Sequence, residues 1–273
     1  KDGDFESLKL VEPDVADILS QLIRTAFVPK DGCTFIVSDF SAIEARVLAW
    51  LSGETWRNEF FKGGGDIYCQ SASLMFNMPV EKHGVNGHLR QKGKVAELAC
   101  GYGGSVGALK AMGADKMGLS DEELEDIVSK WRLSNRNITR FWKTVERSVI
   151  STLKTGRKNV INPELRMYTE MEHAKDKDGN FIKEIYFLTI SLPSGRKLFY
   201  FRPGIKLNRF GSESLVYKSI GKSGTKLDEI ESYGGSLVEN ITQAVARDCL
   251  AVTLLRLKER GFSVVMHIHD EVV

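Results

Sequence analysis

Carboxylate side chains near the two ends of the chain are the residues best suited to chemistry. Asp39 ends the apolar run of residues 34–38, and helical spacing begins directly after it. Near the other end, Asp270 and Glu271 interrupt a second apolar segment. A carboxylate at the C-terminal edge of a strand can hold a hard cation over a sheet. We therefore expect Asp39 and Asp270 to be the two halves of one cation site, with Glu271 beside it.

The terminal segment also fits two other interpretations. His267 and His269 alternate along an expected strand, so both would face one side, and imidazole is a common zinc ligand. With Asp270, these histidines could form the metal site of a nuclease or hydrolase. A polar hairpin turn without chemistry explains the same residues. The segment alone leaves these alternatives open.

A second candidate site lies on a helix predicted over residues 88–102. Arg90, Lys92 and Lys94 crowd its first two turns, where cations oppose the helix dipole by about 0.3–1 kcal/mol each. Arg90 and Lys94 also lie at i, i+4, where like charges repel. A bound triphosphate would make this arrangement favourable, since Arg forms forked hydrogen bonds with phosphate. A solvated basic face explains the charges equally well, and would suit a non-catalytic DNA-binding module.

Two further candidate residue sets lie on this helix and on the helix expected over residues 41–52. Leu98 and Tyr102 continue the side that carries Lys94 and would give a flat apolar floor for a base. Glu44 follows Ser41 by three residues, which is a capping-box pattern. Helix formation alone can therefore explain Glu44.

The composition limits the class of protein. With 273 residues, 42% of them hydrophobic, the chain can form one large domain or two lobes. A net charge of +2 does not by itself indicate a nucleic-acid binder. Its four cysteines are widely separated, which favours a reducing cytoplasm over a disulfide framework. No apolar stretch approaches the roughly 18 residues that span a membrane, and the first residues are not a signal peptide.

Hydrophobic periodicity predicts a mixed order of helices and strands. Helices are expected over residues 14–27, 41–52, 88–102, 120–133, 138–155 and 236–260, and strands over 34–38, 184–192, 197–201 and within 262–273. Ser120 with Glu123 and Ser236 with Glu239 form further capping-box patterns. The strands over 184–192 and 197–201 flank a turn and predict a hairpin. Residues 210–226 are rich in Gly and Ser and weakly patterned.

Three segments, in this order, resemble the motifs of family A (polymerase-I-like) DNA polymerases. They are residues 39–46 (Asp-Phe-Ser-Ala-Ile-Glu-Ala-Arg) for motif A, Arg90, Lys94 and Tyr102-Gly103 for motif B, and His269-Asp270-Glu271 for motif C. Gln243 with Asp248 is similar to the family's Gln-Gly-Thr-Ala-Ala-Asp segment on a long palm helix. The resemblance spans essentially the whole chain. Residues 41–46 and 192–196 look most like phage and prophage members.

This resemblance implies template-directed DNA synthesis, in which dNTPs are joined to a primer 3′-hydroxyl during DNA replication. The expected partners are a DNA primer–template and dNTPs, with no membrane and with no processivity factor identified. The expected location is the cytoplasm of a bacterial or phage-infected cell. Asp39 and Asp270 would hold two Mg²⁺ ions, for which Mn²⁺ can substitute, and the Phe40 carbonyl would complete the ligands. The two aspartates should approach within about 4–6 Å, to share ions about 3.5–4 Å apart.

The resemblance also implies roles for the substrate-binding residues. Arg90 and Lys94 would bind the triphosphate, with Lys94 as general acid to the leaving pyrophosphate. Tyr102, with Leu98 on the same side, would stack near the templating position. Glu44 would block a 2′-hydroxyl and so select deoxyribose. Gln243 and His269 would contact the primer terminus or the minor groove.

Five positions depart from the family pattern. The motif A glutamine is Ala42, the aromatic residue four positions after the motif B lysine is Leu98, and the histidine of an Asp-Ile-His segment is Tyr68. Gly93 and Glu97 are also unusual inside the expected helix. These changes bear on sugar selection and on the binding of phosphate.

The resemblance implies an α+β fold with a right-hand palm, in which helices pack on an antiparallel sheet, and mostly helical fingers. The expected palm is built from residues 1–55 and 232–273, truncated after motif C. The fingers would cover 56–231 and include a hairpin insertion. No thumb is expected, so the isolated fragment should be weakly active or inactive, because phosphate contacts dominate affinity for DNA.

Overall fold

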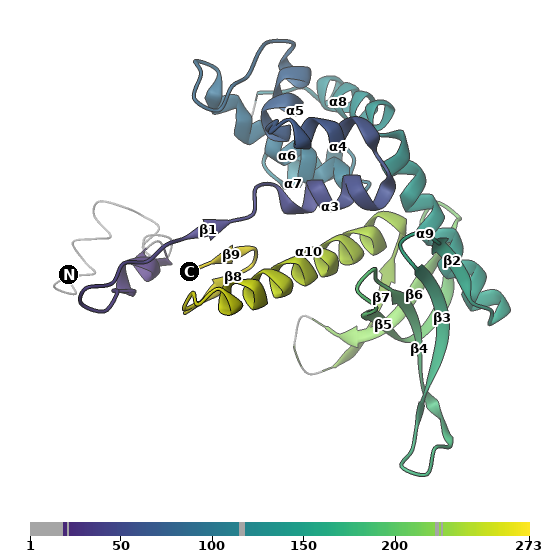
Figure 1. Ribbon diagram of the computed structural model, residues 1–273. Helices are drawn as coiled ribbons and strands as arrows, with labels where there is room; N and C mark the ends of the chain where they lie inside the picture. The colour runs from purple at the N-terminus through teal and green to yellow at the C-terminus, as the bar shows by residue number, and fades with distance from the viewer. Residues whose placement is uncertain (1–18, 21, 115–117, 222–223, 225) are drawn as a thin grey trace, which may run out of the picture. The chain divides into compact units, whose positions relative to one another are not determined.

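The computed structural model describes residues 19–20, 22–114, 118–221, 224 and 226–273, and it divides the chain into two compact units (Figure 1). The first unit joins Lys1–Asp39 to Val264–Val273. The second unit is Phe40–Ser263. The strand that precedes motif A and the hairpin that carries motif C therefore belong to one unit, although they lie at opposite ends of the sequence.

The described residues of the first unit form a small antiparallel sheet with the strand order β1-β9-β8. Its strands are β1 (Ser38–Asp39), β8 (His267–Ile268) and β9 (Glu271–Val272), and a short 3-10 helix, η1 (Ile23–Ala26), precedes them. The final hairpin is confirmed. The strand predicted over 34–38 is wrong except at Ser38, because β9 offers backbone partners only to Ser38 and Asp39. Residues 14–18 and 21 of the helix predicted over 14–27 lie outside the described residues; residues 19, 20 and 22 are helical, and Ile23–Ala26 form the 3-10 helix η1.

Helices fill the first half of the second unit. They are α3 (Ile43–Ser52), α4 (Thr55–Lys62), α5 (Ile67–Phe76), η2 (Gly87–Leu89), α6 (Arg90–Gly101), α7 (Val106–Ala111), α8 (Asp121–Ser134) and α9 (Arg136–Thr155), and a long α10 (Gly234–Glu259) follows the sheet. In the described ranges of the chain, no helix is long and apolar enough to cross a membrane.

One of the three predicted capping boxes is present. Ser120 accepts a hydrogen bond from the Glu123 N–H at the start of α8, and Glu123 reaches back to Ser120. The box predicted at Ser41 is wrong, because α3 begins after Ala42, whose φ of 49° is left-handed and whose cap has no side-chain bond. The box at Ser236 is also wrong, since α10 already begins at Gly234.

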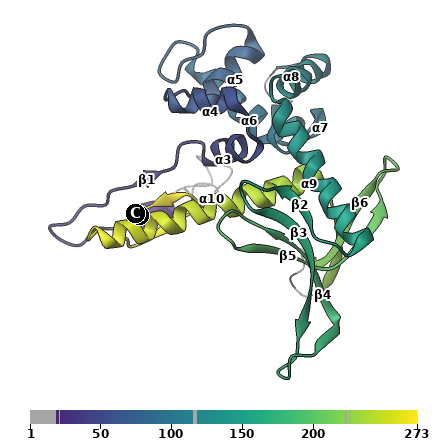
Figure 2. The same ribbon diagram turned by 45° about the vertical axis from the view of Figure 1, so that its right-hand side comes forward.

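Within the described part of the second unit, six antiparallel strands form one sheet with the order β2-β3-β4-β5-β6-β7 (Figure 2). They are β2 (Asn159–Asn162), β3 (Met167–Lys175), β4 (Phe181–Ser191), β5 (Lys197–Leu207), β6 (Glu213–Ile220) and β7 (Leu227–Ser232). The predicted hairpin is confirmed as β4 and β5. The other four strands were not predicted, and β6 lies in the stretch described as weakly patterned.

Helix α9 covers one face of this sheet (Figure 2). Val149 of α9 belongs to the same buried cluster as Leu188 and Ile190 of β4. The hydroxyls of Thr152 and Thr169 meet at 2.7 Å beneath the helix. The cluster continues into α3, α6 and α10, so a single core of the second unit supports the helices that carry motif A and motif B residues.

Candidate active site

The two motif aspartates of the first unit come from strand β1 and from the turn that leads into its neighbour β9. Asp39 pairs with Glu271 across the β1–β9 ladder, and Asp270 directly precedes Glu271 in the turn of the β8–β9 hairpin. Paired Cα atoms in antiparallel strands lie about 4.5–5.5 Å apart. Asp39 is exposed and Asp270 is half-buried, so both lie at a surface that a cation can reach. Carboxylate oxygens are the hard ligands that Mg²⁺ prefers, so this donor set fits such an ion.

The histidines near this hairpin do not follow the predicted alternation. His267 lies in β8, whereas His269 lies in the turn with a left-handed φ of 51°. The strand ends at Ile268, so the expectation that both histidines alternate along it is wrong. In the part of the chain that the structure describes, no three His, Cys, Asp or Glu side chains are grouped to hold a metal ion, and this applies to Asp39, Asp270 and Glu271 as well as to the histidine set. No observation favours the nuclease interpretation with His267, His269 and Asp270.

The cations of motif B lie at the start of α6, as predicted. Arg90 is the first residue of the helix, and its Nε donates to Asp66 Oδ2 at 2.7 Å. The Arg90 guanidinium lies 5.0 Å from the centroid of the Tyr68 ring, and Lys94 Nζ lies 6.0 Å from it. Lys92 lies over Phe76. The basic residues are therefore not simply a solvated face, because side chains of α5 and its cap contact each of them.

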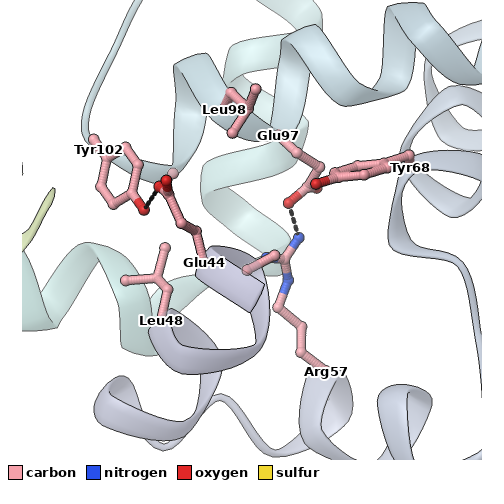
Figure 3. Close-up of a pocket in the computed structure, with 9 residues that line it drawn as sticks. Glu44, Leu48, Arg57, Tyr68, Glu97, Leu98 and Tyr102 are labelled. Carbon is pink, nitrogen blue, oxygen red and sulfur yellow. Dashed lines mark hydrogen bonds and ion pairs between the residues drawn. The ribbon is translucent and has the colours of Figure 1, made fainter. Parts of the chain in front are cut away.

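Glu44 and Tyr102 meet between α3 and α6 (Figure 3). The Tyr102 hydroxyl donates to Glu44 Oε2 at 2.5 Å. Burial, followed by the charge of Glu44, raises the pKa of the Tyr102 hydroxyl well above its ordinary value, so it stays protonated and remains a donor. The capping explanation of Glu44 is therefore replaced by a side-chain contact with the motif B tyrosine. Leu98 lines the same small cavity, while Tyr102 itself is buried.

A buried ion pair on α6 was not found from the sequence. Glu97 is 5% exposed and accepts a hydrogen bond from Arg57 (Figure 3). It also accepts from Ser71 and, at 2.9 Å, from Trp131 Nε1. Arg57 is 1% exposed and lies against the rings of Trp56 and Trp131. This network ties α4, α5 and α8 to α6. The signal in the sequence was a glutamate among the apolar positions of the helix, and it did not indicate Arg57 as the partner.

The two family-like segments near α10 also come together. Asp248 accepts hydrogen bonds from Ser194 Oγ at 2.7 Å and from Arg196 Nε at 2.6 Å. Arg196 also donates to the Ala244 carbonyl. The β4–β5 turn therefore docks on α10 near Gln243. Gln243 is exposed, and its amide donates to Glu239.

The profile of DNA polymerase family A matches residues 11–180, more than half of the 273 residues. The chain belongs to DNA polymerase family A. The DNA polymerase of Bacillus phage SP02 is 49% identical over 274 residues, which cover 100% of this chain and 40% of the phage protein. This similarity confirms the predicted resemblance to phage-type members. The chain thus spans about two fifths of the length of this relative.

More distant matches to the chain are DNA polymerases as well. The thermostable DNA polymerase I of Thermus aquaticus is 32% identical over 163 residues, covering 58% of this chain and 19% of that protein. The solved POL domain of Pol1 from M. smegmatis, in complex with a DNA primer-template and dNTP, aligns with a TM-score of 0.53 and 20% identity. It covers 92% of this chain and 35% of that one. This likeness confirms the α+β fold of a polymerase fragment.

Proposed function

We propose that the polymerase carrying this chain performs template-directed DNA synthesis, transferring a nucleotidyl group from a dNTP to a primer 3′-hydroxyl. The observation that carries the proposal is the pairing of β1 with β9, which places Asp39 opposite Glu271, the residue that follows Asp270 in the hairpin. A primer–template and dNTPs are the partners. We assign the palm to residues 1–55 and 232–273 and the fingers to 56–231.

Asp39 and Asp270 would hold the divalent cations, for which we propose two Mg²⁺ ions with Mn²⁺ as a substitute. The Phe40 carbonyl would complete the ligands, and Glu271 would lie beside them. When bound, such ions activate the attacking hydroxyl and neutralise the charge of the phosphates. The aspartates would contribute carboxylate oxygens that the sheet already holds in place, which limits the reorganisation needed when substrate arrives.

Helix α6 supplies the groups for the triphosphate. Arg90 and Lys94 are one helical turn apart, and both cationic groups lie near the ring of Tyr68. Arg90 would bind phosphate oxygens through its planar fork, and Lys94 would bind as a point charge. Lys94 would also donate a proton to the oxygen of the leaving pyrophosphate, since an ammonium can act as a general acid.

Glu44, Leu98 and Tyr102 would meet the nucleoside. We assign to Glu44 the exclusion of a 2′-hydroxyl, with the bond from Tyr102 fixing its carboxylate. Tyr102 would stack near the templating base, with Leu98 one turn before it. Gln243 and His269 would contact the primer terminus or the minor groove.

Substitution of each aspartate tests the proposal. In a polymerase of full family length that carries this chain, Asp39→Ala or Asp270→Ala should abolish Mg²⁺-dependent primer extension. A matched control is Asp121→Ala, which removes an exposed carboxylate at the start of α8 and should leave extension unchanged. Extension at the wild-type rate by either aspartate variant would contradict the assignment.

A further inference from the structure

Helix α5 lies unusually close to α6 at the point where the motif B cations begin. A Cβ atom on Gly93 would lie 2.0 Å from the Tyr68 carbonyl oxygen and 2.8 Å from the Ala72 nitrogen. Only glycine therefore permits this approach, which accounts for an unusual residue in the first turn of the helix. The close approach brings the first turn of α5 beside Arg90.

Asp66, at the start of α5, is held firmly while it contacts Arg90. Its Oδ1 accepts hydrogen bonds from the backbone N–H groups of Tyr68 at 3.0 Å and Cys69 at 3.2 Å. Its Oδ2 accepts from Arg90 Nε at 2.7 Å. A carboxylate anchored by a helix N-terminus cannot swing away easily, so it fixes the position of the guanidinium that it binds.

Tyr68 contacts the same guanidinium from another direction. Its ring centroid lies 5.0 Å from the guanidinium carbon of Arg90 and 6.0 Å from Lys94 Nζ. Arg stacks favourably on aromatic faces. Tyr68 stands where the family pattern has a histidine, and here its ring supports both cations.

We propose that Asp66 and Tyr68 are positioning residues for Arg90, which together orient its guanidinium for the triphosphate of the incoming dNTP. Asp66 binds Nε, and the Tyr68 ring supports the face of the group, so the rotamers of Arg90 are restricted before substrate binds. A side chain ordered in advance loses less entropy when it binds its ligand. This inference rests on the proposed function.

The opposite effect of Asp66 is also physically reasonable and must be tested. A carboxylate 2.7 Å from Nε carries a negative charge that opposes the binding of a phosphate. If this repulsion were the larger effect, removal of Asp66 would tighten dNTP binding. The anchoring of both Asp66 oxygens favours positioning, since a mere counter-ion does not need a fixed geometry.

The test measures dNTP affinity without chemistry, in the polymerase that carries this chain, on a primer that lacks a 3′-hydroxyl. Asp66→Ala should weaken dNTP binding about 10-fold and raise KM similarly, with kcat changed less than about 3-fold. Asp66→Asn should restore most of the affinity, because Asn also caps helices and can accept from Nε. Tyr68→Phe should match the wild type, whereas Tyr68→Ala should weaken binding about 3-fold or more.

Ser120→Ala is the matched control, since it removes the cap of α8 at a site that does not contact Arg90. It should lower the melting temperature without changing dNTP affinity. Equal or tighter dNTP binding by Asp66→Ala would overturn the inference, as would a loss in Ser120→Ala equal to that in Asp66→Ala. Failure of the wild type itself to bind dNTP would instead overturn the proposed function. If Asp66→Ala does not fold, the comparison of Tyr68→Phe with Tyr68→Ala decides.

Discussion

Two ion pairs join α6 to its neighbours, and they differ in exposure. The pair between Arg90 and Asp66 leaves its side chains 27% and 29% exposed, whereas the pair between Arg57 and Glu97 leaves 1% and 3%. A partly exposed pair leaves its guanidinium within reach of a ligand from solvent, while the carboxylate stays bound to it. A buried pair cannot be broken without leaving a charge in a low-dielectric interior. We infer that the partly exposed ion pair at the start of α6 serves ligand binding, whereas the buried ion pair in its middle stabilises the fold.

The largest expected effect on stability comes from breaking the buried pair. Glu97→Ala leaves the Arg57 guanidinium without its carboxylate and also removes the acceptor for Ser71 and Trp131. We expect a loss of about 3–5 kcal/mol in the free energy of unfolding. Denaturant unfolding monitored by tryptophan fluorescence measures it. A loss below about 1 kcal/mol would show that the two pairs do not differ in the way proposed.

A smaller loss is expected when the half-exposed pair is broken. Asp66→Ala removes a helix cap and an ion pair, which together should cost about 1–2 kcal/mol of unfolding free energy. The same unfolding experiment, run beside Glu97→Ala, makes the comparison direct. If Asp66→Ala lowered the free energy of unfolding as much as Glu97→Ala, the distinction between a ligand-binding ion pair and a stabilising one would be contradicted.

The contact at the far end of α6 should affect selectivity more than stability. Tyr102→Phe removes the hydrogen bond to Glu44 at a cost of about 1 kcal/mol. Glu44→Ala should admit ribonucleotides, which competition between a dNTP and the matching rNTP measures. If Glu44→Ala discriminated between dNTP and rNTP as the wild type does, the role of Glu44 would be only its hydrogen bond with Tyr102.

The smallest effect concerns pH. Partial burial alone would raise the pKa of Asp66, but the hydrogen bonds from Arg90 and from the Cys69 and Tyr68 N–H groups hold it below its ordinary value. A depressed folded-state pKa contributes stability above the unfolded pKa of about 3.9, and this contribution is lost as the pH falls through the folded-state pKa. The difference in unfolding free energy between wild type and Asp66→Asn should therefore shrink in acid. A difference that stays constant from pH 7 to pH 3 would contradict this linkage.

Local patterns predicted much of this molecule. The helix predicted over residues 88–102 is present as α6 (Arg90–Gly101), after the short η2 turn, and Leu98 and Tyr102 follow at the predicted i, i+4 spacing. Turn chemistry correctly predicted the β4–β5 hairpin and the final β8–β9 hairpin. These features depend on residues close in sequence, whose dihedral preferences and periodicity are visible without a fold.

Long-range partners could not be predicted in the same way. Glu44 matched a capping box but bonds Tyr102, 58 positions away, because Ala42 adopts the left-handed conformation that begins α3. Arg57 gave no signal as the partner of Glu97. Strand β6 was not predicted because it lies in a stretch rich in Gly and Ser and buries Ser214, Leu215 and Val216 in succession, without alternation. In each case tertiary packing outweighed the local preference.

The most direct test of the account asks whether Asp39 and Asp270 act as one unit. Single-turnover nucleotide incorporation is measured for Asp39→Ala, for Asp270→Ala and for the double variant, in a polymerase of full family length carrying this chain. Residues that hold the same ions are strongly non-additive, so the double variant should be about as slow as either single one. If the rate losses of the two single variants multiplied in the double variant, a shared site built on the β1–β9 pairing would be contradicted. Incorporation by either single variant at the wild-type rate would contradict it as well.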